Sequence, residues 1–158
     1  MKAFASLAAL PPKTPDATSG ETLRFEGVAA ARGGRRLLHG IDFEVRPGEI
    51  VGLAGRNGVG KTTLLQLANG LLAPTAGRVL LGDTPVRSLR RRAVARRIAL
   101  VPQDLHVPFP FRAGELVLMG RAPHQPLVGL DSESDVRRAK EALARLGIED
   151  LADRSVET

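Results

Sequence analysis

The sequence contains no cysteine, no tryptophan and no tyrosine among its 158 residues. The absence of cysteine excludes disulfides, thiolate metal sites and cysteine nucleophiles. Five phenylalanines are the only aromatic residues, which argues against a surface that stacks on nucleic-acid bases. No apolar run approaches the ~20 residues that a membrane-spanning helix needs. The three histidines, His39, His106 and His124, are far apart in the chain and lack metal-ligand spacing.

The remaining composition is that of an ordinary globular domain. Hydrophobic residues make up 43% and charged residues 25%, and 23 Lys+Arg against 17 Asp+Glu give a net charge of +6. The length corresponds to about one domain. The start of the chain differs, because a short apolar patch at 4–10 is followed by prolines, serine and glycine. We predict that residues 1–21 form a disordered N-terminal extension rather than a signal peptide.

Apolar patterning predicts alternating strands and helices along the rest of the chain. Two almost fully apolar runs, 50–54 and 98–101, are typical of strands buried on both faces of a parallel sheet. Further strands are predicted over 22–28, 37–46 and 79–81, and helices over 61–69, 88–96, 115–120 and 132–146. The last helix has the clearest start, since Ser132 and Asp135 resemble a capping box.

One segment has the spacing of a phosphate-binding motif. The run Gly55-Arg56-Asn57-Gly58-Val59-Gly60-Lys61-Thr62 has the P-loop spacing G-x-x-x-x-G-K-[ST]. Its glycines allow successive N–H groups to point inward around phosphate oxygens, and the following helix adds a favourable dipole for an anion. Lys61 can reach the β- and γ-phosphates, and the Thr62 hydroxyl can ligand Mg²⁺. A glycine-rich turn with an incidental lysine is the alternative, which the predicted strand before the loop and helix after it disfavour.

The motif and its surroundings resemble the ATP-binding cassette (ABC) family. The resemblance rests on residues 55–63, on Arg46-Pro47-Gly48-Glu49-Ile50 before them, and on Ala99-Leu100-Val101-Pro102-Gln103, which is similar to the family's Q-loop. Residues 107–124 are similar to the importer branch that serves iron–siderophore, haem and vitamin B12 uptake. The resemblance covers residues 22–158.

The family implies a fold and a set of site residues. The expected fold is α/β, a P-loop NTPase core like that of ABC ATPases with a flanking antiparallel sheet and the start of an α-helical subdomain. We expect the core over 22–104 and the helical part over 105–158. The implied ligands are ATP and Mg²⁺. The cofactor-binding residues would be Gly55, Arg56, Asn57, Gly58, Val59, Gly60, Lys61, Thr62, Thr63 and Arg32. Thr62 and Gln103 would hold the metal, and Lys61 and Gln103 would act in catalysis.

The chain also departs from the family pattern. Arg32 stands before Gly33-Gly34, where relatives place an aromatic residue that stacks on adenine. An arginine plane can stack on a base, but Arg32 can equally be a solvated surface residue. The sequence has neither an apolar strand ending in Asp-Glu nor an L-S-G-G-Q signature. We therefore expect the N-terminal part of such a subunit, whether from a database fragment, a truncated gene or a split gene.

Partners follow from the same resemblance. They are a transmembrane permease, a second ATP-binding subunit in a full-length homodimer and, indirectly, a substrate-binding protein, with the subunit peripheral on the cytoplasmic face of the inner membrane. The expected function is Mg-ATP binding that powers uptake, with binding but no hydrolysis in these 158 residues. The alternatives are a P-loop ATPase acting on nucleic acid and a non-catalytic nucleotide-binding fragment.

The six arginines at 87–97 form a basic cluster that suits nucleic acid or lipid headgroups. We favour a solvated helix face instead, because no aromatic residue interleaves with the arginines.

Overall fold

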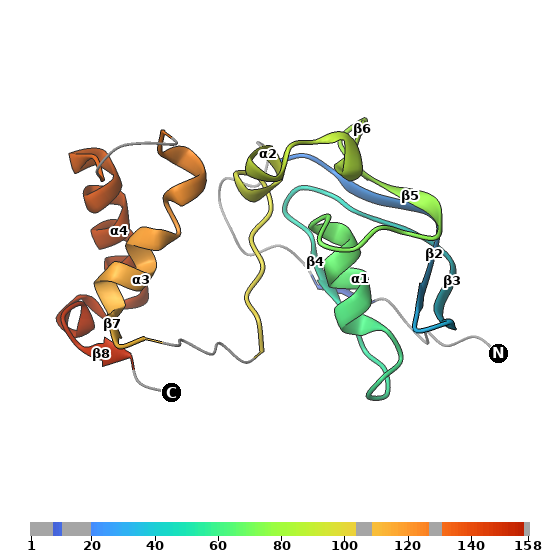
Figure 1. Ribbon diagram of the computed structural model, residues 1–158, viewed down its shortest axis with the longest axis horizontal. Coiled ribbons are helices and arrows are strands. Elements are labelled where there is room, and N and C mark those ends of the chain that lie inside the picture. Colours follow the sequence, from blue (N-terminus) through green and yellow to red (C-terminus); the bar gives the residue numbers. More distant parts are fainter. Residues whose placement is uncertain (1–7, 11–19, 104–108, 127–130, 157–158) are drawn as a thin grey trace. The chain divides into compact units, whose positions relative to one another are not determined.

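The structure is a computed structural model that describes residues 8–10, 20–103, 109–126 and 131–156. It divides into two compact units, residues 1–100 and 101–158. Figure 1 shows the elements of each. The division falls four residues before the predicted end of the core at 104.

The first unit is built on an antiparallel sheet. Its long hairpin consists of β2 (Leu23–Arg32) and β3 (Arg35–Val45), and β5 (Ala76–Leu81) and β6 (Thr84–Pro85) complete the order β3-β2-β5-β6. Alternating apolar residues place one face of this sheet inward. The predicted flanking antiparallel sheet is therefore confirmed, with longer strands than the pattern indicated.

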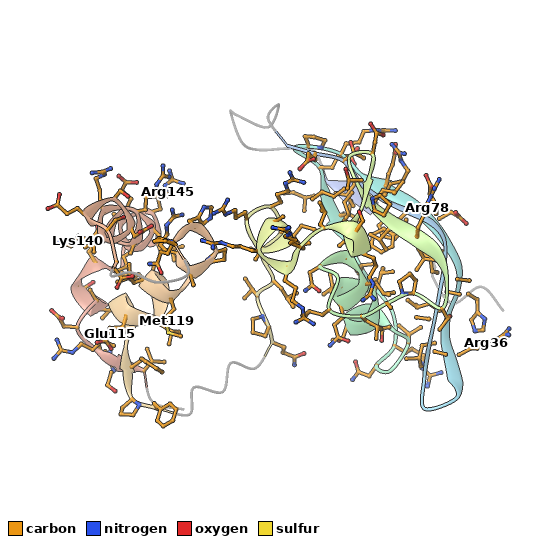
Figure 2. All side chains as sticks on the ribbon, turned by 45° about the horizontal axis from the view of Figure 1, so that its top comes forward. Arg36, Arg78, Glu115, Met119, Lys140 and Arg145 are labelled. Atoms are coloured by element: carbon orange, nitrogen blue, oxygen red, sulfur yellow. The ribbon has the colours of Figure 1, made fainter. Side chains whose placement is uncertain are left out.

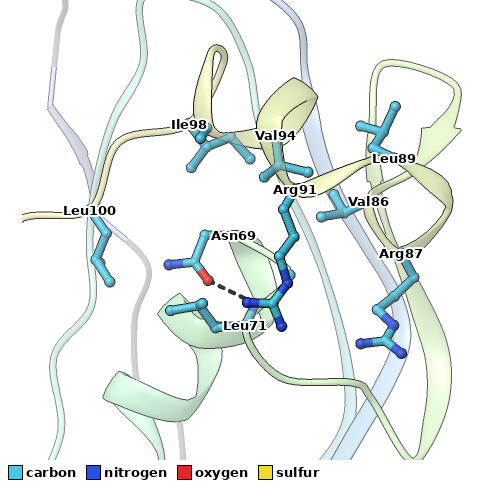
Figure 3. A pocket seen from close by; sticks show the side chains of 11 residues that line it. Asn69, Leu71, Val86, Arg87, Leu89, Arg91, Val94, Ile98 and Leu100 are labelled. Atoms are coloured by element: carbon cyan, nitrogen blue, oxygen red, sulfur yellow. Dashed lines mark hydrogen bonds between the residues drawn. The ribbon is translucent and has the colours of Figure 1, made fainter. Parts of the chain in front are cut away.

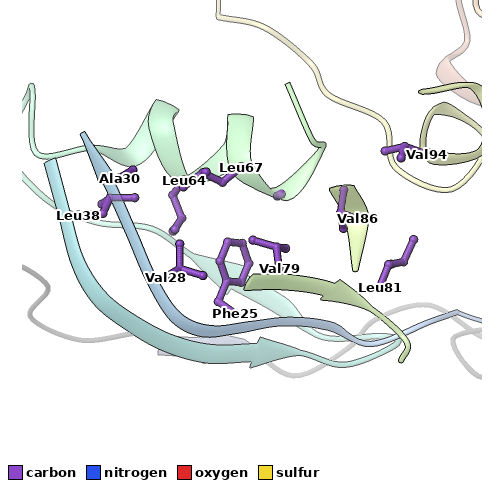
Figure 4. Close-up of a cluster of buried hydrophobic side chains, with 11 residues drawn as sticks. Phe25, Val28, Ala30, Leu38, Leu64, Leu67, Val79, Leu81, Val86 and Val94 are labelled. Carbon is purple, nitrogen blue, oxygen red and sulfur yellow. The ribbon is translucent and has the colours of Figure 1, made fainter. Parts of the chain in front are cut away.

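Helix α1 (Lys61–Ala68) packs on the inner face of the sheet, where it closes the hydrophobic core. In Figure 4, Leu64 points from the helix toward Val28 and Phe25 on the sheet. Phe25 also stacks on Phe43 across the hairpin, with ring centroids 4.4 Å apart. The buried apolar side chains of the core come from β2, β3 and β5, from α1 and from the segment 86–94: Phe25, Val28, Ala30, Leu38, Leu64, Leu67, Ala68, Val79, Leu81, Val86 and Val94.

The two apolar runs do not form the predicted buried parallel strands. The first forms only the short strand β4 (Ile50–Gly52), which pairs antiparallel with β1 (Ala8–Leu10), and Ile50 is 54% exposed. The second run, 98–101, is not a strand, and Val101 is 89% exposed. A strand requires a hydrogen-bonded neighbour, and no described strand pairs with this run. β1 also lies within the segment 1–21 predicted to be disordered, whereas residues 1–7 and 11–19 lie outside the described ones.

The predicted basic helix over 88–96 is divided in two. Residues Val86–Ser88 form the 3-10 helix η2, and α2 covers only Arg91–Ala95. Ser88 does not cap α2, because its hydroxyl donates to the carbonyl of Pro85 at 2.7 Å and the helix begins after Arg90. The interruption follows from the extended backbone at Leu89 and Arg90.

The second unit is mainly helical. It contains β7 (Phe111–Arg112), α3 (Ala113–Met119), η3 (Ala122–His124), α4 (Glu133–Leu146), η4 (Glu149–Leu151) and β8 (Ser155–Val156), and β7 pairs with β8. The predicted capping box is confirmed. The Asp135 amide donates to the Ser132 hydroxyl at 3.2 Å, and the Ser132 amide donates to the Asp135 carboxylate. Gly147 ends α4 in the left-handed conformation.

Candidate functional site: a phosphate-binding loop

The loop at residues 55–60 connects β4 to the start of α1. Gly60 has a φ of 110°, and a Cβ at this position would stand 2.8 Å from the Leu38 side chain. Gly58 also has a left-handed φ of 78°, but no atom lies within 4 Å of the position where its Cβ would be. Glycine at 60 therefore satisfies both a backbone and a packing requirement, whereas glycine at 58 satisfies only a backbone requirement.

The loop presents a row of unused backbone donors. The N–H groups of Gly60, Lys61, Thr62 and Thr63 donate to no acceptor among the described residues, as expected for the first turn of a helix. The first intrahelical bond in α1 runs from the Leu64 N–H to the Gly60 carbonyl at 2.9 Å. These four donors and the positive end of the helix dipole provide a binding site for an anion.

The Lys61 side chain folds back over the loop. Its ammonium group donates to the carbonyl of Gly55 at 2.7 Å and to that of Arg56 at 3.0 Å. An ammonium has three N–H groups, so two of them hold the loop and one is left for a ligand. This geometry places the only lysine of the segment beside the donor row, and it fixes the loop's curvature at the same time.

The other predicted loop residues differ in exposure. Arg56, Asn57 and Thr62 are exposed, whereas Thr63 is buried at 9%. The hydroxyl of Thr62 is therefore accessible, while Thr63 offers its amide and packs its side chain toward the core. Val59 is half-buried, and its amide donates to the Arg56 carbonyl in a turn.

Two predicted residues are not joined to the loop by the structure. Arg32 ends β2 and pairs with Arg35 at the hairpin turn, and its side chain lies outside what the structure describes. Gln103 belongs to the second unit and is exposed. The roles of Arg32 against adenine and of Gln103 toward Mg²⁺ and the γ-phosphate therefore stay predictions.

Sequence reasoning missed Leu38, a supporting residue of the site. Its side chain is 1% exposed and occupies the space beside Gly60, so it fixes how closely the helix start approaches the hairpin. The only sequence signal was its place in the apolar pattern of β3, which does not reveal contact with a loop more than 20 residues later. No side-chain cluster with metal-ligand character occurs among the described residues.

The donor set fits a nucleotide polyphosphate. Four free amides, one ammonium and an exposed hydroxyl all lie within four consecutive residues, 60–63. Phosphate oxygens accept such hydrogen bonds, and a hydroxyl next to them suits a Mg²⁺ ion bound to the same phosphates. The fold and the loop thus define a P-loop nucleotide-binding protein.

A comparison with protein-family models gives the family. The ABC transporter model matches residues 38–158, and the chain belongs to the ABC transporter ATP-binding family. The predicted α/β fold of an ABC ATPase is confirmed by the solved structures to which the chain is similar. One is cbiO1 from Clostridium perfringens, part of the ABC transporter complex cbiONQ, with a TM-score of 0.69 and 32% identity. That match covers 87% of this chain and 55% of the cbiO1 chain.

Curated relatives are about 40% identical to this chain in sequence. The cobalamin import ATP-binding protein BtuD of Halobacterium salinarum is 42% identical over 135 residues, covering 85% of this chain and 33% of the relative. The hemin import ATP-binding protein HmuV of Gloeobacter violaceus is 41% identical over 137 residues, covering 84% of this chain and 47% of the relative. The chain therefore spans a third to about half of the length of these relatives. None of the helices within the described ranges is long and apolar enough to cross a membrane.

Proposed function

We propose that this chain is the nucleotide-binding part of an ABC importer subunit, which binds Mg-ATP to power uptake through a separate membrane permease. The observation that carries the proposal is the row of four free amides beside the Lys61 ammonium. The branch of the family is supported by the relatives, whose names are cobalamin import and hemin import ATP-binding proteins. The transported substrate is then an iron–siderophore, haem or a cobalamin-type compound.

Each site residue has a defined task in this proposal. The amides of residues 60–63 and the Lys61 ammonium bind phosphate oxygens, and the Thr62 hydroxyl and the Gln103 amide oxygen hold Mg²⁺. The metal, when bound, neutralises phosphate charge. Arg32 lies at the end of the hairpin strand and would stack on adenine.

We further propose that these 158 residues do not hydrolyse ATP by themselves. Phosphoryl transfer needs a group that orients or activates water and groups that stabilise charge on the γ-phosphoryl. The sequence offers Lys61, Thr62 and Gln103, but no apolar strand that ends in Asp-Glu and no L-S-G-G-Q segment. In a full-length subunit paired with a second copy and with its permease, at the cytoplasmic face of the membrane, ATP hydrolysis is expected.

Calorimetric titration with Mg-ATP tests the binding site. Lys61→Ala removes the one lysine beside the donor row, and charge-assisted hydrogen bonds of this kind contribute about 1.5–3 kcal/mol. We expect a loss of roughly tenfold to hundredfold in affinity. Lys140→Ala, which removes an exposed lysine from α4, is the matched control and should bind like the wild type. Equal affinities for all three proteins would count against the P-loop assignment.

A phosphate-release assay tests the second part. The purified chain and its Lys61→Ala variant should both release phosphate at the background rate. Steady release by the wild type that Lys61→Ala abolishes would show that a catalytic carboxylate lies within these residues.

A further inference from the structure

The strand pairing of the β2–β3 hairpin is interrupted by a bulge. Val28 pairs with Ile41 across the hairpin. The next pair joins Ala30 to Leu38, so β2 advances by two residues where β3 advances by three. Gly40 lies in the longer stretch and has a left-handed φ of 55°. An extra residue with a left-handed glycine is typical of a β-bulge, which bends the strand that contains it.

The bulge changes which side chains of β3 face the core. Phe43 and Ile41 pack against the core, and uninterrupted alternation along the strand would continue with His39. His39 is instead exposed, and Leu38 takes the core position, where it is 1% exposed. The inward direction of Leu38 therefore depends on the extra residue that Gly40 accommodates.

From this inward position Leu38 borders the last residue of the phosphate-binding loop. A Cβ on Gly60 would lie 2.8 Å from Leu38 Cδ2 and 3.5 Å from the carbonyl oxygen of Leu37. Gly60 begins the donor row, and its carbonyl accepts the first intrahelical bond of α1 from the Leu64 N–H at 2.9 Å. A shift of β3 at Leu38 would therefore move the donor row and the first turn of α1 together.

The close contact is at the loop end of α1. Beyond the other end of the helix, Asn69 and Leu71 line a pocket of about 590 Å³ (Figure 3). Close-packed side chains transmit a displacement to their neighbours, whereas empty space absorbs it. The hairpin is therefore coupled through Leu38 to the phosphate end of the helix.

We propose that Gly40 and Leu38 are positioning residues for phosphate binding. The bulge at Gly40 turns Leu38 inward, and Leu38 holds Gly60 and the donor row in the shape that receives phosphate oxygens. A loop that is already held in its binding shape loses less conformational entropy on binding, so phosphate affinity depends on positions 38 and 40. The inference rests on the proposed function for the identity of the ligand, and on the packing alone for the shape of the loop.

Calorimetric titration of the 158-residue chain with Mg-ATP and with Mg-tripolyphosphate tests the proposal. Gly40→Ala puts a side chain on a left-handed residue, and Leu38→Ala leaves a void beside Gly60. A variant whose loop has the binding shape only about a tenth of the time loses roughly tenfold in affinity. We expect that loss in both variants and for both ligands, because tripolyphosphate has no base and reports on the phosphate end alone.

Conservative variants at the same two positions should restore binding. Gly40→Asn should keep most of the affinity, because asparagine tolerates a left-handed φ better than alanine does. Leu38→Met should keep it because methionine fills a similar volume. Leu38→Val makes a smaller void than Leu38→Ala and should show a smaller loss in the same direction, which keeps the test available if Leu38→Ala does not fold.

Two matched variants separate positioning from a general loss of stability. Gly82→Ala lies in the turn between β5 and β6 at a similar φ of 59°. Leu81→Ala removes the same side chain as Leu38→Ala from the opposite end of the buried cluster (Figure 4). Both should lower the urea midpoint, yet bind both ligands within about twofold of the wild type, because distant sites act independently.

Hydrogen exchange of the Leu64 amide gives a readout that needs no ligand. This amide donates to the Gly60 carbonyl, so it should exchange faster in Gly40→Ala and Leu38→Ala than in the two matched variants. Wild-type affinity and Leu64 exchange in folded Gly40→Ala and Leu38→Ala would overturn the proposal, as would an equal loss of affinity in the matched variants. If the wild type binds neither ligand but Leu64 exchange still separates the two pairs, the proposed function fails while the positioning of the loop stands.

Discussion

The two units bury their side chains in different ways. In the first, the core joins residues far apart in sequence, such as Phe25, Leu64 and Val79, across three strands and a helix. In the second, the buried apolar side chains among the described residues are Ala139 and Leu143, both on α4. Polar contacts also hold α4 in place: Arg121 donates to Asp135 at 3.0 Å, and Ser132 caps the same helix.

The phosphate-binding loop lies in the first unit, whose core is formed by residues far apart in the sequence. A phosphate-binding loop needs its glycines and lysine held in a fixed shape, and Leu38 and α1 supply that support from within the core. The helical unit depends instead on the capping box of α4 and on the partly buried ion pair between Arg121 and Asp135. The four predictions that follow test this contrast, from the largest expected effect to the smallest.

The largest effect is expected from Leu64→Ala. Leu64 is 2% exposed in the core of the first unit, and removing such a side chain costs about 2–5 kcal/mol of unfolding free energy. Urea unfolding measures the loss, and hydrogen exchange locates it, with faster exchange expected in β2 and β5 and little change in α4. Leu146→Ala, at a 73% exposed position, is the control and should be near neutral. Equal destabilisation by both would contradict the described core.

The second prediction concerns the two glycines of the loop. Gly60→Ala meets both an unfavourable φ and the Leu38 side chain, whereas Gly58→Ala meets only an unfavourable φ. A non-glycine residue held in such a conformation costs on the order of 1–3 kcal/mol, to which position 60 adds a clash. We expect Gly60→Ala to lose Mg-ATP binding in calorimetry and Gly58→Ala to lose less. The reverse order would mean that Leu38 does not support the loop.

The third prediction is a pH dependence that arises from Asp135 in the helical unit. Hydrogen bonds from Ser132, and then from Arg121, hold the pKa of Asp135 below its usual value. Because the folded pKa lies below the ~3.9 of an unfolded aspartate, the carboxylate stabilises the fold at higher pH and this stabilisation is lost as pH falls through the folded pKa. Unfolding followed by circular dichroism from pH 7 to pH 2 measures the profile.

Asp135→Asn provides the comparison for that profile. It should be less stable than the wild type at pH 7, and the difference should shrink in acid because the wild type loses the same interaction. Asp150→Asn, at an exposed position in η4, should keep the wild-type profile. A constant difference between wild type and Asp135→Asn across the whole range would contradict the assigned role.

The smallest effect is expected from Arg78→Gln, which breaks an exposed ion pair on the sheet (Figure 2). Arg78 donates to Glu26 at 2.6 Å and lowers the pKa of that carboxyl, but its side chain is 63% exposed. Solvent and salt screen such pairs. Arg121→Gln should lower the urea midpoint more, because the Arg121 and Asp135 side chains are 22% and 9% exposed. A larger shift of the urea midpoint for Arg78→Gln than for Arg121→Gln would contradict the importance of the Arg121–Asp135 pair in the helical unit.

The features that sequence predicted well are determined over short distances along the chain. The Ser132–Asp135 capping box, the apolar positions of α4 and its end at Gly147 all lie within one helix. The P-loop spacing is equally local, because the glycines set the backbone directly and the lysine follows at once. The family resemblance rested on the same local segments and was confirmed by the family match.

The sequence by itself thus determined the loop, the main helices and the family, since local backbone preferences and motif spacing specify them. Tertiary structure alone decided whether the apolar runs at 50–54 and 98–101 became strands. Their compositions are similar, yet one pairs over only three residues and the other does not pair with any described strand. Tertiary structure also placed Leu38 beside Gly60. Hydrogen-bonded neighbours and packing partners come from distant parts of the chain, so composition within a run cannot supply them.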